Sequence, residues 1–381
     1  MSSNSLFKGF TLGILGGGQL GRMLIQPCIN YNIKTAVLDP DPEAPCNGVC
    51  TEFHQGSFKD YDDVIRFGDK VDMLTIEIEH VNVDALEELE RRGKTIFPQP
   101  SVLRIVQDKG LQKQFYKANH IPTSDFVLID HEDELKDHIH LLPFFQKTRT
   151  SGYDGRGVKG IFVPEDFQEA LAGPSLLEKK VDYDKEIAVI VAQSATGETA
   201  VYPVVELVFH PRQNLLNYLA SPAAISDGVA EKAKKIALDI IHKLNMTGIL
   251  AVEMFVTPDE EVLVNEIAPR PHNSGHHTIE ANITSQYEQH LRAILGLPLG
   301  ASDAIHPSIM INLLGEPGYE GEAIYSGLDE VLKIRGVYIH LYGKTITRPY
   351  RKMGHITITG SDWISVHNKA KRVIDNLKII A

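Results

Sequence analysis

The chain has 381 residues, enough for two or three domains that each bury a core. Hydrophobic residues make up 43% and charged residues 23%, as in ordinary globular proteins, and no apolar run is long enough to span a bilayer. A net charge of −12 argues against a nucleic-acid-binding surface, and three cysteines exclude a disulfide framework.

The N-terminus and the cysteines predict the compartment. The first ten residues lack the apolar segment of a signal peptide, and the odd cysteine count suits a reducing environment. Cys46 and Cys50 lack the second ligand pair that a zinc site needs. We therefore expect a cytoplasmic protein without nucleic-acid or membrane partners.

The first hundred residues alternate between apolar runs and helical periodicity. Strands are predicted at 11–15, 35–38 and 73–78, and helices at 19–31 and 82–92. This alternation predicts a parallel sheet of βαβ type that ends near residue 105.

The middle of the chain predicts an α+β arrangement instead. The predicted helices are 108–119, 166–172 and 229–244. The predicted strands are 126–129, 143–148, 158–163, 186–193, 201–209, 249–256 and 262–268. The last eighty or so residues add short alternating runs at 336–342 and 355–359 and a helix at 363–377.

The first motif is a glycine-rich turn. Residues 16–21 fit G-x-G-x-x-G between a strand and a helix, and Asp39 ends the next predicted strand. This context is typical of NAD or FAD binding. It also suits another phosphate-bearing ligand at the helix N-terminus, or a tight turn that needs glycine for packing.

A second glycine-rich loop joins two predicted strands at residues 147–157. It has no G-K-[ST], which argues against a P-loop nucleotidase. Its backbone N–H groups can fold over phosphates as a lid, and Lys147 on the strand beside it can reach a phosphate oxygen. The alternative is an ordinary hairpin.

Two glutamates are predicted to face each other across a hairpin. A turn centred between Asp259 and Glu260 places Glu253 opposite Glu266. A divalent cation relieves their repulsion, and oxygen ligands on a rigid sheet favour Mg²⁺. Asn265 contributes only if the strand bulges there. The alternative is solvated glutamates at a sheet edge.

Two polar segments follow. Residues 269–277 include Arg270, His272, Asn273 and His276, which suit a small oxyanion substrate better than zinc. Between Val331 and Ser361 the chain has no acidic residue and six basic ones, so it predicts either a phosphate site or a solvated face. Those basic residues are Lys333, Arg335, Lys344, Arg348, Arg351 and Lys352.

Together these motifs resemble the ATP-grasp superfamily. Four stretches, 16–23, 147–157, 265–277 and 351–355, resemble its N5-carboxyaminoimidazole ribonucleotide synthetase family. The resemblance implies a Rossmann-like domain at 1–105, a central ATP-grasp domain at 106–300 and a small β-rich C-terminal domain at 301–381. It also implies a homodimeric ligase that uses ATP, Mg²⁺, bicarbonate and 5-aminoimidazole ribonucleotide (AIR).

The resemblance also implies roles for individual residues. Asp154 and Lys352 would handle protons; Arg270, His272 and Asn273 would hold bicarbonate; and Glu253 and Glu266 would bind the metal. The implied ATP contacts are Lys109, Lys147, Gly152, Tyr153, Asp154, Gly155, Arg156, Gly157, Glu178, Lys179, Lys180, Val181, Glu186, His210, Asn265 and Glu266. The implied AIR contacts are Gly18, Gln19, Leu20, Glu77 or Glu79, Tyr153, Arg156, Lys344, Arg351 and Lys352.

One departure from the family pattern is visible at residues 108–113. Lys109 stands where the family has an ATP-contacting arginine, which keeps the charge but loses the planar guanidinium. Three rival functions stay open: another ATP-grasp ligase, such as a formate-using transformylase or a biotin carboxylase; an NAD- or FAD-dependent oxidoreductase; and a nucleotide-binding regulator.

Overall fold

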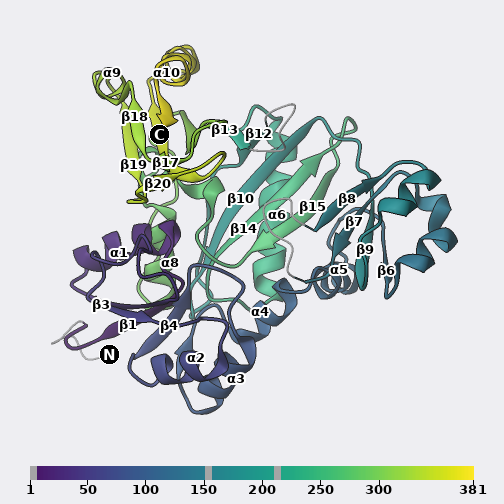
Figure 1. Ribbon diagram of the computed structural model, residues 1–381, viewed down its shortest axis with the longest axis horizontal. Helices are drawn as coiled ribbons and strands as arrows, with labels where there is room; N and C mark the ends of the chain where they lie inside the picture. Colours follow the sequence, from purple (N-terminus) through teal and green to yellow (C-terminus); the bar gives the residue numbers. More distant parts are fainter. Residues whose placement is uncertain (1–6, 151–156, 210–215) are drawn as a thin grey trace.

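The computed structural model describes residues 7–150, 157–209 and 216–381. The N-terminal sheet is parallel, as predicted, in the order β3–β2–β1–β4–β5 (Figure 1). Its strands are β1 (Thr11–Leu15), β2 (Lys34–Asp39), β3 (Glu52–Gln55), β4 (Met73–Ile76) and β5 (Thr95–Ile96). Strands β1 and β4 are apolar and almost wholly buried, as expected of a parallel sheet covered on both faces.

Helices cover this N-terminal sheet and lead out of it. They are α1 (Gln19–Asn30), α2 (Tyr61–Gly68), α3 (Val83–Arg91), α4 (Pro100–Val106) and α5 (Lys109–Ala118). One core joins β1 and α1 to α8 (Gln286–Ile294), which comes from much later in the chain. The N-terminal sheet is therefore packed against the central part of the protein.

A small antiparallel sheet follows in the order β6–β9–β7–β8. Its strands are β6 (Phe126–Ile129), β7 (Phe144–Thr148), β8 (Val158–Ile161) and β9 (Ser175–Lys179). Two 3₁₀ segments accompany it, η1 (Glu132–Leu141) and η2 (Pro164–Glu169). The helix predicted at 166–172 is thus only a short 3₁₀ segment that starts two residues earlier.

The largest sheet is the central one, whose strands are ordered β15–β14–β10–β12–β13–β16–β21–β19 (Figure 1). Its strands are β10 (Lys185–Gln193), β12 (Val205–Phe209), β13 (Leu216–Ser221), β14 (Gly248–Val256), β15 (Val262–Ala268), β16 (Ser308–Leu314), β19 (Val337–Leu341) and β21 (Lys352–Thr359), with β11 (Thr199–Val201) beside β10. Helix α6 (Asp227–Lys243) packs on β10, β14 and β15 over an apolar core. The strand predicted at 201–209 is interrupted around Pro203, which has no N–H to donate.

The C-terminal region continues the central sheet through the pairing of β13 with β16. Its smaller elements are η3 (Asn273–Gly275), α7 (Thr278–Ala281), β17 (Gly321–Glu322), β18 (Ile324–Ser326), α9 (Leu328–Leu332), β20 (Ile346–Thr347), α10 (Trp363–Asn376) and β22 (Lys378–Ile380). The predicted combination of α/β, α+β and β-rich parts is confirmed, and the boundaries at 105 and 300 stay predictions. In the described ranges no helix is long and apolar enough to cross a membrane.

The core under α6 provides a test of stability. Leu250 on β14 is fully buried there. We expect Leu250→Ala to lower the free energy of unfolding by about 2–5 kcal/mol, because the cavity is not refilled. Ile364→Ala on α10, where the side chain is 76% exposed, is the matched control and should change it by less than about 0.5 kcal/mol. Equal urea midpoints for the two variants would contradict this assignment of the core.

Candidate active site

The β14–β15 hairpin brings two glutamates together. Glu253 pairs with Glu266, as predicted, but the reasoning behind that prediction was partly wrong. On the turn side of Glu253, Met254 pairs with Val264. This register centres the turn on Asp259 rather than between Asp259 and Glu260. A β-bulge at Asn265 shifts the register by one residue and restores the pairing of the two carboxylates.

The bulge has a consequence for Asn265 itself. In a regular strand this side chain would point away from the glutamates. Here its Oδ1 lies 3.5 Å from Nζ of Lys147, which comes from β7 of the small sheet. Lys147, predicted to bind phosphate, and Asn265 of the hairpin therefore meet between the small and central sheets. This region between the two sheets is here called the cleft.

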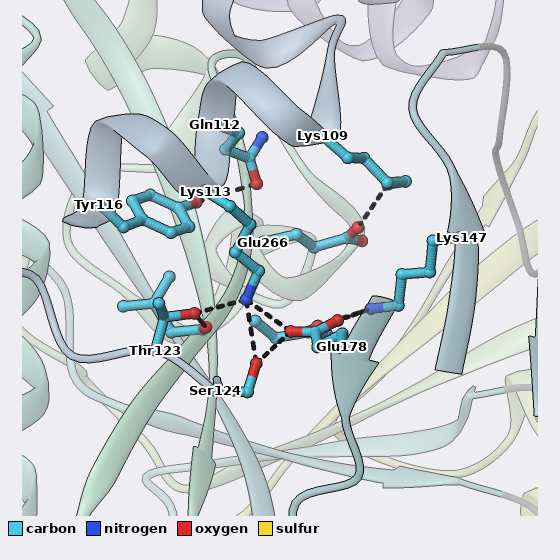
Figure 2. A network of polar contacts seen from close by, with 11 residues as sticks. Lys109, Gln112, Lys113, Tyr116, Thr123, Ser124, Lys147, Glu178 and Glu266 are labelled. Carbon is cyan, nitrogen blue, oxygen red and sulfur yellow. Dashed lines mark hydrogen bonds and ion pairs between the residues drawn. The ribbon is translucent and has the colours of Figure 1, made fainter. Parts of the chain in front are cut away.

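A buried ion network forms the back of this cleft (Figure 2). Glu178 on β9 is held by two lysines, with Lys113 Nζ 2.5 Å from its Oε1 and Lys147 Nζ 2.5 Å from its Oε2. Ser124 donates a hydrogen bond to the same Oε1, and Thr123 accepts one from Lys113 at 2.5 Å. Burial opposes the ionisation of Glu178, but Lys147 and Lys113 outweigh it and lower its pKa to about 2.

Within this network the cations outnumber the carboxylates. Two ammonium groups share one carboxylate, and the side chain of Lys147 is more exposed than that of Lys113. Burial lowers the pKa of Lys147, but Glu178 more than offsets it and the pKa is raised. Lys147 is thus a permanent cation at the edge of an otherwise neutralised cluster, which is suited to an anionic ligand.

The carboxylate pair itself is electrostatically asymmetric. Burial and repulsion from Glu266 raise the pKa of Glu253 to about 8. For Glu266 burial acts in the same direction, but Lys109 and Lys147 outweigh it and its pKa is lowered. Lys109 Nζ lies 3.4 Å from Oε2 of Glu266. The cleft therefore holds two opposed carboxylates with only one fully compensated, and hard oxygen donors of this kind fit Mg²⁺.

Lys109 is placed by the start of helix α5. Asp108 caps this helix by accepting hydrogen bonds from the N–H groups of Gly110 and Leu111. The carboxylate of Asp108 also binds Arg149 through two nitrogen atoms, at 3.0 and 2.6 Å. The helix start is therefore fixed to the small sheet, and Lys109 projects from it toward Glu266 (Figure 2).

The polar segment after β15 borders the same pair. Nε2 of His272 is 3.7 Å from Oε1 of Glu253. Burial, with Arg270 and Lys352 nearby, lowers the pKa of His272 to about 3, so the imidazole is neutral and this contact is not an ion pair. Arg270 is paired with Glu79 at 2.7 Å, which connects the segment to the N-terminal part of the chain.

Several of the predicted AIR residues, from the N- and C-terminal parts of the described chain, meet at one junction. Lys344 Nζ donates to Gln19 Oε1 at 3.1 Å and to the carbonyl of Lys352 at 2.8 Å. Glu77 accepts from the N–H groups of Leu20 and Gly21, both at 3.2 Å. Arg351, Glu77, Lys352 and Arg348 are all close enough to Lys344 to affect its pKa.

The glycine-rich turn is occupied by the protein's own carboxylates. Asp39 accepts from the N–H of Gly17 at 2.6 Å and from that of Asp41 at 2.9 Å. Glu77 accepts hydrogen bonds from the N–H groups at the start of α1, where a dinucleotide-binding protein would bind a pyrophosphate. These contacts favour an internal capping role for the turn over dinucleotide binding.

Comparisons with known proteins agree with this geometry. The sequence matches the ribonucleotide synthetase preATP-grasp domain over residues 10–107, the ATP-grasp domain over 114–287 and the phosphoribosylaminoimidazole carboxylase C-terminal domain over 308–369. The N5-carboxyaminoimidazole ribonucleotide synthase of Bacillus subtilis is 37% identical over 94% of this chain and 93% of its own length. The chain belongs to the N5-carboxyaminoimidazole ribonucleotide synthase family.

Solved structures support the family assignment over the whole chain. The N5-carboxyaminoimidazole ribonucleotide synthetase of Thermotoga maritima is 41% identical with a TM-score of 0.89, over 98% of this chain and 99% of that one. An Aspergillus clavatus synthase described as complexed with ATP is 34% identical with a TM-score of 0.88, over 96% of this chain and 97% of that one. By contrast, the chain spans only 66% of the Candida albicans phosphoribosylaminoimidazole carboxylase, to which it is 38% identical over 96% of its own length.

Within this synthase family member, several predicted residues are not part of the cleft geometry described so far. Residues Gly152, Tyr153, Asp154, Gly155, Arg156 and His210 lie outside the described residues. Gly157 closes the β7–β8 hairpin by accepting from the N–H of Thr148 at 2.9 Å. Lys179 faces Asp125 at 3.8 Å on the surface, and the N–H of Lys180 binds the carbonyl of Pro143. Their roles, like that of Val181, stay predictions.

Lys113 was not among the predicted site residues. It ends the stretch 108–113 that was compared with the family pattern, and its spacing of four residues from Lys109 places both lysines on one face of α5. A cluster of buried histidines was also missed. His340 and His355 stack at 4.4 Å, His340 binds Glu280 at 2.6 Å, and Tyr342 hydrogen-bonds His355 at 3.0 Å. This cluster connects α7 to β19 and β21 beside Lys344, whose Nζ lies 5.6 Å from the centre of the Tyr342 ring.

The role of Lys113 can be tested by removing its charge. Lys113→Met keeps a similar volume but removes one of the two cations on Glu178 and its hydrogen bonds to Glu178, Thr123 and Ser124, so we expect a loss of about 1–3 kcal/mol in the free energy of unfolding. Lys234→Met is the matched control, because that lysine pairs with Glu231 on the surface of α6. Thermal unfolding should separate the two variants by several degrees. A Lys113→Met protein as stable as the control would refute the network.

The carboxylate pair predicts a pH-dependent stability. Because the folded-state pKa of Glu253 is raised from 4.5 to about 8, its contribution to stability is present below pH 4.5 and is lost as the pH rises toward 8. Without divalent cations, Glu253→Gln should therefore raise the melting temperature by several degrees at pH 8.5 and leave it nearly unchanged at pH 4.5. An equal shift at both pH values would show that the effect is not electrostatic.

Proposed function

We propose that this chain carboxylates AIR with ATP and bicarbonate, giving N5-carboxyaminoimidazole ribonucleotide, ADP and phosphate in purine biosynthesis. The strongest support for this function is a pair of opposed carboxylates, Glu253 and Glu266. Two lysines, Lys109 and Lys147, face this pair. This arrangement lies in a chain that is 33% identical to an Aspergillus clavatus synthase described in complex with ADP and AIR, with a TM-score of 0.86.

The nucleotide would lie in the cleft between the small and central sheets. Lys147, Lys109 and the loop at 151–157 would hold its phosphates, and the hinge around Glu178 and Val181 its base. Glu186, at the start of β10, would accept hydrogen bonds from the ribose hydroxyls. Further ATP contacts carried over from the family are Lys179, Lys180, His210 and Asn265.

Glu253 and Glu266 would hold Mg²⁺. The pair fits the ion because burial and repulsion from Glu266 both disfavour a charged Glu253, and a divalent cation between the two carboxylates would favour its charged form. When bound, the ion would neutralise charge that develops on the phosphate oxygens. Lys109 and Lys147 would orient the same oxygens from the opposite side of the cleft.

Bicarbonate would lie at the end of β15, next to the terminal phosphate. Arg270 and Asn273 would bind it, and neutral His272 can donate a hydrogen bond without adding charge. Bicarbonate is a poor electrophile, and its phosphorylation to carboxyphosphate makes the carbon reactive. Because carboxyphosphate hydrolyses readily, this step needs a closed site from which water is excluded.

AIR would occupy the junction of the N- and C-terminal parts. Its phosphate would be met by Lys344, Arg351 and the lid residue Arg156, and its ribose and base by Gln19, Glu77 and Tyr153. Gly18, Leu20 and Glu79 complete the predicted contacts. Carboxyphosphate would break down to CO₂ and phosphate in the closed site. The exocyclic amine of AIR would then attack the CO₂ carbon and lose a proton, and Asp154 together with Lys352 would handle that proton.

Two rival functions are weakened by the site. An oxidoreductase would need the glycine-rich turn for its cofactor, and Asp39 and Glu77 occupy that turn. A regulator without catalysis would not need a lysine-compensated carboxylate pair. Other ATP-grasp ligases share the nucleotide cleft, and only the acceptor substrate separates them from the proposed reaction.

The remaining expectations also belong to this proposal. We propose a homodimer in the cytoplasm, with domain boundaries at 105/106 and 300/301. A plant relative is described as chloroplastic, so location varies among the chain's relatives.

The deciding experiment measures ADP release from Mg-ATP with and without AIR and bicarbonate. The proposed function requires strong ADP release only when both are present. Release that depends on bicarbonate but ignores AIR would keep the ATP-grasp chemistry and reject the acceptor. Omitting Mg²⁺ should abolish release, and restoring activity with a monovalent salt alone would contradict the metal assignment.

Lys344 makes the binding of AIR depend on pH. Burial and the neighbouring Arg351 lower the pKa of Lys344 to about 8, so its positive charge is present below that pH and lost above it. At saturating Mg-ATP we expect the KM for AIR to rise roughly tenfold between pH 7 and pH 9. Lys344→Arg should flatten this rise, because arginine stays charged. A KM that rises equally in both proteins would exclude Lys344 as the titrating group.

A further inference from the structure

Tyr183 lies in the connection between the small and central sheets. This connection runs from β9 to β10 and is anchored at both ends, by the N–H of Lys180 on the carbonyl of Pro143 and by the N–H of Asp184 on the carbonyl of Val256. The second anchor is next to Tyr183 and belongs to the central sheet. The tyrosine is thus fixed relative to β10 and β14.

The ring and the hydroxyl of Tyr183 have separate partners. The ring stacks on Phe255 of β14, with centroids 4.6 Å apart and an interplanar angle of 24°. The hydroxyl donates a hydrogen bond of 2.5 Å to Oε1 of Glu186. Phe255 and Glu186 are cross-strand neighbours, so the tyrosine covers the pair from one side of the sheet.

The Glu186 carboxylate depends on this contact for its orientation. Within the part of the chain that the structure describes, Tyr183 is the hydrogen-bond donor recorded for it. Burial raises the pKa of Glu186, and Tyr183 opposes that shift by stabilising the charged form. Hydrogen bonds to an ionised oxygen are short and directional, so the bond restrains a side chain that otherwise has three free torsions.

The position of Glu186 gives this restraint a function. Along β14, Phe255 and Glu253 point to the same face two residues apart, and their partners on β10 are Glu186 and Ala188. One face of the sheet therefore carries the carboxylate pair at one point and the Tyr183–Glu186 pair a short way further along. With the phosphates at the carboxylate pair, as proposed, this spacing would place Glu186 on the side of the nucleoside.

We propose that Tyr183 is a positioning residue that holds the Glu186 carboxylate for the ribose hydroxyls of ATP and so determines selectivity for ribose over deoxyribose nucleotides. The hydroxyl of Tyr183 occupies one oxygen of Glu186 and leaves the other lone pairs for the sugar. This inference rests on the proposed function, because it takes the cleft to be an ATP site.

Binding measurements test the proposal without requiring catalysis. The full chain with Mg²⁺, without AIR or bicarbonate, is titrated with ATP and with 2′,3′-dideoxy-ATP. Tyr183→Phe keeps the stack on Phe255 and removes only the hydroxyl. We expect its Kd for ATP to rise roughly three- to tenfold, while its Kd for the dideoxy nucleotide changes less than about twofold.

A double variant shows whether Tyr183 acts through Glu186. In a Glu186→Gln background, Tyr183→Phe should add little further loss of ATP affinity. Tyr61→Phe on α2 is the matched control, since that tyrosine is 41% exposed against 42% for Tyr183 and lies away from the cleft. It should leave both dissociation constants unchanged.

Three results would overturn the proposal. They are an equal loss of affinity for both nucleotides in Tyr183→Phe, full additivity in the double variant, and an unchanged preference for ATP in Glu186→Gln. Failure of the proposed function looks different, because ATP would still bind with its ribose preference while ADP release ignored AIR and bicarbonate.

Discussion

The repulsion between Glu253 and Glu266 is the constraint around which the cleft is built. Directly opposed side chains have Cβ atoms about 5 Å apart, and two like unit charges at that separation repel by roughly 3 kcal/mol at the effective dielectric of a protein. The β-bulge at Asn265 imposes this proximity, since a regular ladder from the same turn would not pair the two residues. Lys109 from α5 and Lys147 from β7 compensate only one member of the pair, and this imbalance is the basis of the proposed metal site.

The lysine–carboxylate contacts connect parts of the chain that are distant in sequence. Lys113 and Lys147 meet at Glu178, which places α5, β7 and β9 around one buried carboxylate (Figure 2). Thr123 extends the network to the carbonyl of Val264 on β15, at 2.7 Å. The small sheet is thus attached to the β14–β15 hairpin by polar contacts at the back of the cleft. Such contacts fix the lysines before ligand arrives, which lowers the entropic cost of binding an anion.

Much of this arrangement was predictable because it depends on local patterns. The βαβ alternation, the β14–β15 hairpin and the facing glutamates follow from strand periodicity and turn residues, and the structure contains them. The bulge at Asn265 was not predictable, since no residue type marks it and two register errors cancelled. Lys113 was missed because a lysine within an amphipathic helix ordinarily points to solvent, whereas here burial is imposed by Glu178 from another sheet.

The junction near Lys344 shows that the charges the fold places around a lysine matter more for phosphate binding than the composition of its segment. The stretch from Val331 to Ser361 is basic in sequence, yet its lysines are not equivalent. Lys333 is paired with Glu330 on the surface. Lys344 is instead half-buried beside Tyr342 and linked to Gln19 of the N-terminal part, and its neighbours Arg351 and Lys352 add like charge. A cation held there against repulsion has a strong electrostatic reason to bind a phosphate, and the paired one does not. The functional residues of a basic segment are therefore those whose charge the fold leaves uncompensated.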